Sequence, residues 1–154
     1  MKNPASYIFL LFFIISCQDD VKFNNPAFEG QKDNVFWRAV DSKATLSGGS
    51  LTIEGFTSTE KVSLKTNSTI LGPYPLGTGI ENTATYVLTD ANDSITFSTG
   101  NGKGNGEIII EKYENNTITG TFKFNAVNVN NIPPDKPTIN FHYGHFYKVP
   151  VTNL

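Results

Sequence analysis

The sequence predicts an all-β fold, an antiparallel meander of about nine strands that forms either a sandwich or a lipocalin-like barrel. Several segments alternate apolar and polar residues, which is the period of a strand with one buried face. Glycine, asparagine and aspartate gather between these segments, where short turns need them. Neither heptads nor an amphipathic helix interrupts the pattern after the N-terminal segment. The pattern does not distinguish a barrel from a sandwich.

The first predicted hairpin turns at Gly48-Gly49, because a two-residue turn needs positive φ angles that glycine adopts readily. This turn sets similar side chains opposite one another on the two strands. The expected pairs are Leu46 with Leu51, Ala44 with Ile53, and Lys43 with Glu54.

The second predicted hairpin turns through a four-residue loop, Asp90-Ala91-Asn92-Asp93. The loop sets Leu88 opposite Ile95 and Tyr86 opposite Phe97, all on one face. The polar residues of both strands then share the other face.

The register of the third hairpin depends on whether its turn has an even or an odd number of residues. Residues 117–125 alternate strictly, with aromatic side chains on one face. A two-residue turn at Asn115-Asn116 would put Glu107 and Glu111 on that aromatic face, and burying unpaired carboxylates is costly. We therefore predict a three-residue turn, Glu114-Asn115-Asn116, with Asn116 left-handed. The expected pairs are then Ile108 with Phe122, Ile110 with Gly120, and Glu107 with Lys123.

Further strands are expected over residues 35–40, 61–66 and 138–149. Two proline-rich segments are expected to be the longest loops, residues 72–77 and residues 133–137. We expect these loops to border any ligand surface.

The N-terminal segment predicts a secretory signal peptide. Lys2 precedes an apolar run from Ile8 to Ile15, which is far shorter than the ~20 residues that span a bilayer. Ile14-Ile15-Ser16-Cys17 resembles a bacterial lipobox, and the resemblance implies that Cys17 becomes the acylated first residue of the mature protein. Each buried methylene of an acyl chain such as palmitate contributes about 0.8 kcal/mol to membrane binding. We therefore expect anchoring to a membrane through acylated Cys17.

The expected organisation is a signal peptide at residues 1–16, a lipidated cysteine and tether at 17–30, and one β domain at 31–154. Gln18-Asp19-Asp20 resembles the acidic export signal of some surface-exposed Bacteroidetes lipoproteins, and a solvated linker is the alternative interpretation. The lone cysteine, Cys17, has no disulfide partner within the chain. The formal net charge of −2 argues against a nucleic-acid partner. The oligomeric state is left open.

Six segments along the chain are typical of one family: Phe23-Asn24-Asn25-Pro26-Ala27-Phe28, Asn34-Val35-Phe36-Trp37-Arg38-Ala39, Leu51-Thr52-Ile53, Gly106-Glu107-Ile108-Ile109-Ile110, Gly120-Thr121-Phe122-Lys123-Phe124 and Gly144-His145-Phe146. In these segments the chain resembles a family of uncharacterised Bacteroidetes outer-membrane lipoproteins, a domain of unknown function. The resemblance implies one β domain over nearly the whole mature chain and adds no chemistry.

Four residues are candidates for ligand binding. Trp37 offers a stacking platform for a glycan, although a single strand tryptophan is more often part of a core. Tyr74 lies in the proline-rich segment 72–77. His142 and His145 are the only histidines, and a regular strand places residues three apart on opposite faces. We expect His145 to pack with aromatic residues and His142 to face solvent, unless a bulge at Gly144 brings the two together for a metal.

Other motifs give no catalytic residue, metal or cofactor. The glycine-rich run 100–106 is expected to be a hairpin loop, because no helix follows to complete a phosphate-binding loop. Asp90, Asn92 and Asp93 lack the glycine and distal glutamate of an EF-hand. No serine lies in a Gly-x-Ser-x-Gly nucleophile elbow.

Three functional hypotheses remain. The first is a non-enzymatic domain, lipid-anchored at the outer membrane, that displays a surface for a protein or a glycan. The alternative is a lipocalin-like carrier of a small hydrophobic ligand, which needs a hollow interior. The third is a hydrolase whose dispersed carboxylates converge in a cleft. A filled interior would favour display over transport, and the residues expected to fill it are Phe122, Phe124, Ile108, Ile110, Leu46 and Leu51.

Overall fold

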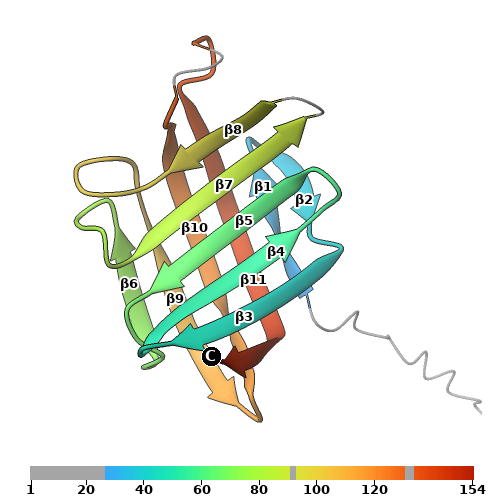
Figure 1. The fold of residues 1–154 in the computed structure, drawn as a ribbon, viewed down its shortest axis with the longest axis vertical. Helices are drawn as coiled ribbons and strands as arrows, with labels where there is room; N and C mark the ends of the chain where they lie inside the picture. Colours follow the sequence, from blue (N-terminus) through green and yellow to red (C-terminus); the bar gives the residue numbers. More distant parts are fainter. Residues whose placement is uncertain (1–26, 91–92, 131–133) are drawn as a thin grey trace, which may run out of the picture.

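The computed structural model describes residues 27–90, 93–130 and 134–154, and this part of the chain forms one mixed β-sheet (Figure 1). The signal peptide, Cys17 and the tether up to residue 26 lie outside the described residues. The strands are β1 (Ala27–Lys32), β2 (Val35–Arg38), β3 (Asp41–Ser47), β4 (Ser50–Phe56), β5 (Glu60–Thr66), β6 (Gly72–Leu76), β7 (Thr83–Asp90), β8 (Asp93–Ser98), β9 (Asn105–Glu114), β10 (Thr117–Asn128) and β11 (Thr138–Asn153).

The sheet closes on itself. Its strand order is β2-β1-β11-β3-β4-β5-β7-β8-β10-β9-β6, and β11 pairs additionally with β10. Pairing therefore runs in a ring through β11, β3, β4, β5, β7, β8 and β10, which makes the sheet barrel-like. In Figure 1, strands β3, β4, β5, β7 and β8 cross in front of β9, β10 and β11. The all-β prediction is confirmed, with eleven strands in the described residues and one parallel pair, β11 with β3.

The first two hairpins have the predicted registers. Across the turn at Gly48-Gly49, whose φ angles are 57° and 83°, Leu46 faces Leu51 and Ala44 faces Ile53. Tyr86 faces Phe97 across the second hairpin. The apolar pairs from which both registers are predicted are therefore the pairs that form in the structure.

The third hairpin has the predicted pairs but not the predicted turn. Glu114 pairs with Thr117, which leaves a two-residue turn of Asn115 and Asn116 with φ angles of 51° and 53°. The register then shifts between Thr119 and Gly120, where one residue of β9 is left over. This bulge supplies the odd residue that the predicted pairs require, and it restores Ile108 opposite Phe122 and Glu107 opposite Lys123.

Two segments expected to be irregular are strands. Residues 27–30, assigned to the tether, belong to β1, where Phe28 is 1% exposed. Residues 72–76, assigned to a loop, form β6. The prolines Pro73 and Pro75 cannot donate backbone hydrogen bonds, and β6 tolerates them because it is an edge strand that pairs only with β9.

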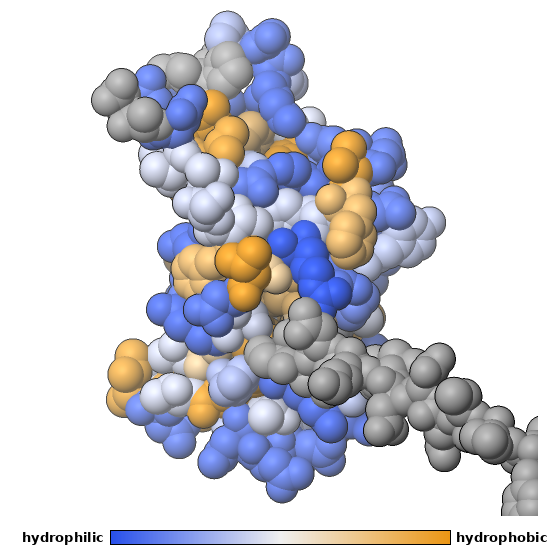
Figure 2. Space-filling model, turned by 90° about the vertical axis from the view of Figure 1, so that its right-hand side faces the viewer, coloured by the Kyte–Doolittle hydropathy of each residue, from blue (hydrophilic) through white to orange (hydrophobic). Residues whose placement is uncertain are grey.

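Aromatic side chains fill the inside of the barrel. Eight of them, from strands of both layers, are each at most 4% exposed: Phe28, Trp37, Tyr86, Phe97, Phe122, Phe124, Phe141 and Phe146. Ring centroids lie 4.9 Å apart for Phe124 and Phe141, and 5.1 Å apart for Phe28 and Phe122. Of the residues expected to line a filled interior, five are buried and Leu46 packs partly buried against them. On the side of the molecule at the right of Figure 1, apolar side chains form separate patches divided by hydrophilic ones (Figure 2).

Candidate functional site

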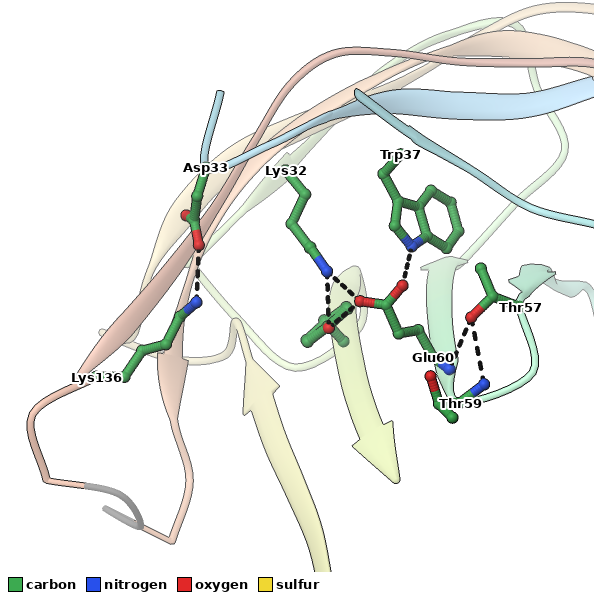
Figure 3. A network of polar contacts seen from close by, with 8 residues as sticks. Lys32, Asp33, Trp37, Thr57, Thr59, Glu60 and Lys136 are labelled. Atoms are coloured by element: carbon green, nitrogen blue, oxygen red, sulfur yellow. Dashed lines mark hydrogen bonds and ion pairs between the residues drawn. The ribbon is translucent and has the colours of Figure 1, made fainter. Parts of the chain in front are cut away.

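Trp37 belongs to a polar network inside the barrel, centred on Glu60 (Figure 3). The indole Nε1 donates to Glu60 Oε2 at 2.7 Å, and the Tyr86 hydroxyl donates to Oε1 at 2.5 Å. Lys32 Nζ forms an ion pair with Oε1. Strands β1, β2, β5 and β7 thus meet at one carboxylate, which we call the Glu60 network.

The environment of Glu60 holds it in its ionised form. Burial alone would raise the pKa of Glu60, but the hydrogen bonds from Lys32, Tyr86 and Trp37 outweigh burial and lower that pKa. Burial and the contact with ionised Glu60 raise the pKa of Tyr86 well above its usual value. A carboxylate that accepts from three donors is suited to holding strands together rather than to exchanging protons. Trp37 is one of these donors and is buried, so it is a core residue and not an exposed platform.

Tyr74 is also a core residue. Tyr74 is 8% exposed on β6, and its hydroxyl donates to the Ile70 carbonyl at 2.6 Å. The hydroxyl ties the loop before β6 to the strand, and the ring offers no open face to a ligand.

Of the two histidines, His142 lies within a bulge of β11 and His145 follows that bulge. Phe122 pairs with Gly144 and Phe124 pairs with Phe141, so His142 and Tyr143 together oppose the single residue Lys123. At this bulge the backbone of Tyr143 has a φ of 48°, in the left-handed region.

The bulge changes which side chains of β11 face inward. Phe141 is buried before it, and Gly144 and Phe146 are buried after it, whereas a regular strand would bury Tyr143 and His145. The expectation that His145 packs with aromatic residues of the interior is therefore wrong. His145 faces outward, and so does His142.

Ion pairs surround His145 on the outer face of the sheet. Its Nε2 lies 3.0 Å from Glu29 Oε1, and Glu29 Oε2 lies 2.8 Å from Nη1 of Arg38. On the next two strands, β10 and β9, Lys123 Nζ lies 2.8 Å from Glu107 Oε1. Arg38 and His145 both lie beside Glu29, and Lys123 lies beside Glu107, so each of these basic side chains has an acidic neighbour.

Between these ion pairs the outer face is hollowed by a shallow groove of about 340 Å³, which we call the outer groove. It crosses three neighbouring strands, and its side chains combine apolar, hydroxyl and charged groups. The residues that line it are Glu107 and Ile109 of β9, Thr121, Phe122 and Lys123 of β10, and Tyr143, Gly144 and His145 of β11. Tyr143 is 81% exposed, so its ring stands in solvent beside the groove.

The described residues show no metal centre. Within them, no group of three or more histidine, cysteine, aspartate or glutamate side chains is placed to hold an ion. Asn92, one of the three residues compared above with an EF-hand loop, lies outside the described residues. Residues 99–104 connect β8 to β9, which are not paired with each other, so the glycine-rich run 100–106 is not the expected hairpin loop. No helix in the described part of the chain is long and apolar enough to cross a membrane.

The family model described as "Domain of unknown function (DUF6252)" matches residues 24–150 of the chain. The chain belongs to this family. The match confirms the resemblance to a domain of unknown function, and it begins ahead of β1, in agreement with β1 being part of the fold. Comparison with curated proteins and with solved structures gave no match.

The DUF6252 domain therefore brings together only one of the four candidate residues, His145, with neighbours that the sequence did not single out. Strict alternation places Tyr143 in the interior, so the sequence predicts a packing residue there. Alternation places Thr121 on the polar face of its strand, but nothing in the sequence marks it as a ligand contact. One signal was present: Gly144 follows Tyr143, and glycine within a strand often marks a bulge.

Proposed function

We propose that this DUF6252 protein is a lipid-anchored lipoprotein of the outer membrane that displays its β domain as a non-catalytic binding surface for a protein or a glycan. The observation that carries the proposal is the contrast between a filled interior and a hollowed exterior. Aromatic rings occupy the centre of the barrel, while the outer groove exposes an aromatic ring and several polar groups.

The filled interior favours display over the carrier alternative. A barrel that carries a hydrophobic ligand needs an apolar cavity, and ligand pockets typically have volumes of roughly 300–1,000 Å³. Here the inward-facing rings contact one another across the barrel, with Tyr86 of β7 and Phe141 of β11 5.9 Å apart between centroids. A ligand would have to displace these rings from both layers.

The anchor is supported by the sequence. Ile14-Ile15-Ser16-Cys17 provides an acylation site after a short apolar run. Nine residues then separate Cys17 from Ala27, the first residue of β1, and an extended chain of that length reaches roughly 30 Å. This distance is enough to hold the domain clear of a lipid surface.

Membrane fractionation of cells that express the full chain tests the anchor. The wild type should be retained in the outer membrane, and external protease should digest the domain if it faces outward. Cys17→Ala should abolish acylation and leave unprocessed precursor or soluble protein. Ser16→Gly, which keeps a small residue before the cysteine, serves as the matched control and should behave as the wild type. Undiminished retention of acyl-free Cys17→Ala protein in the outer membrane would refute the anchor.

A further inference from the structure

We propose that the outer groove is a carbohydrate site, in which an uncharged sugar ring stacks on Tyr143 and its hydroxyls bond to Thr121, Lys123 and Glu107. This inference rests on the proposed function, because it names the ligand class of the displayed surface.

Tyr143 is placed as a binding residue rather than a packing residue. Its side chain is 81% exposed, and its backbone has a φ of 48°, which is unfavourable for a bulky residue. Strained backbone and bulges that re-aim a side chain occur preferentially at functional sites. In this fold the bulge turns the ring of Tyr143 out of the barrel and holds it beside Ile109 and His145.

The polar groups around the ring match the hydroxyls of a sugar. A sugar hydroxyl both donates and accepts, and the groove offers Lys123 as a donor, Glu107 as an acceptor and Thr121 as either. Lys123 and Glu107 are 61% and 32% exposed in their side chains, so a ligand can reach both. The apolar part of the groove, Ile109 with the Tyr143 ring, suits the C–H face of the same ring.

Other ligand classes fit the groove less well. An anionic ligand needs surplus positive charge, but Lys123 is paired with Glu107, and His145 lies beside Glu29. An extended peptide binds by adding a strand to an open sheet edge. The groove instead lies over β10, which pairs on one side with β9 and on the other with β11.

Titration of the full, acylated protein with defined oligosaccharides tests the inference. The protein is held in a detergent without a sugar headgroup, and the probes are neutral gluco-, galacto-, manno- and xylo-oligosaccharides together with a sulfated oligosaccharide. Isothermal titration calorimetry should show saturable binding of at least one neutral probe and weaker binding of the sulfated one. Tyr143→Ala should weaken the binding at least about tenfold, because the C–H face of the sugar loses the aromatic surface on which it packs.

Lys148 provides the matched control for the backbone. Its φ is 50°, close to that of Tyr143, and it lies on the same strand outside the groove. Tyr143→Gly and Lys148→Gly therefore relieve the same kind of backbone strain, but only Tyr143→Gly should lose sugar binding. Lys148→Gly should bind within about twofold of the wild type.

Two results would overturn the inference: no neutral oligosaccharide binds, or a bound one is indifferent to Tyr143→Ala. If the domain instead binds a protein through its outer face and no sugar, the carbohydrate site is refuted while the displayed surface stands. If sugars bind as described but the Cys17→Ala protein stays in the outer membrane, the anchor fails and the carbohydrate site stands.

Discussion

Replacing Gly144 by alanine should destabilise the barrel, because the space that a Cβ would need is occupied. Gly144 of β11 lies opposite Phe122 of β10, and a Cβ built at Gly144 would lie 2.5–2.6 Å from three atoms of the Phe122 ring. Ordinary van der Waals contact begins at 3.4 Å. The ring would therefore have to retreat by nearly an ångström.

The magnitude of the effect depends on whether Phe122 can move. Its ring is 3% exposed, and its centroid lies 5.1 Å from that of Phe28 and 6.2 Å from that of Phe141. Overpacking of a core in this way typically costs about 1–3 kcal/mol. A Gly→Ala change also restricts the unfolded chain, which raises the free energy of unfolding by only about 0.4–1 kcal/mol. We therefore expect the free energy of unfolding to fall by about 1–2 kcal/mol.

Urea unfolding of the full chain, followed by tryptophan fluorescence from Trp37, measures this change. Gly79→Ala is the control, because nothing lies within 4 Å of a Cβ there, and its stability should be unchanged or slightly higher. In a Phe122→Leu background the cost of Gly144→Ala should shrink, because the smaller side chain leaves room. A Gly144→Ala protein as stable as the wild type, or an equal cost in both backgrounds, would refute the steric reasoning.

Three further predictions concern the interior, a turn and a sheet edge. Glu60→Gln should lower stability at pH 7 by about 1–3 kcal/mol, because Lys32 loses its charged partner. Since the folded-state pKa of Glu60 is lowered from 4.5, the wild type should lose this advantage as the pH falls from about 4.5 through that pKa, and urea unfolding from pH 7 to 2 should show the two proteins converging. Asn116→Gly should raise the midpoint of thermal unfolding and add up to about 1 kcal/mol, because the residue has a φ of 53° in a two-residue turn; a lower midpoint would contradict the turn assignment. Replacing Pro73 and Pro75 together by threonine should increase self-association in analytical ultracentrifugation, because β6 would gain backbone donors at an open edge, and an unchanged sedimentation profile would contradict that role for the prolines.

Registers that depend on neighbouring strands could be predicted from the sequence. Leu46 opposite Leu51 follows from a glycine turn and from like side chains pairing, both of which are local. The third hairpin shows the limit of this reasoning. Pairing Ile108 with Phe122 requires an odd number of unpaired residues between the two strands. A bulge within β9 adds one unpaired residue to a two-residue turn, which meets this requirement as well as a three-residue turn does. Nothing local distinguishes the two.

Features that depend on distant strands were not predictable. Pro73 and Pro75 usually indicate a loop, and only the position of β6 at the edge of the sheet makes a strand acceptable. Tyr143 faces outward because Gly144 must lie against the Phe122 ring, a contact between β11 and β10. Closure of the barrel likewise depends on β11 pairing with both β10 and β3, far apart in the sequence.

Native mass spectrometry of the protein extracted from its own membranes tests the central claim most directly, because it reports the N-terminus and the contents of the barrel together. A filled, anchored domain predicts a chain that begins at Cys17, carries acyl groups on that residue and holds no apolar ligand in the barrel. An unmodified N-terminus would contradict the anchor. A stoichiometric apolar ligand that stays bound when the detergent is stripped would contradict the filled barrel.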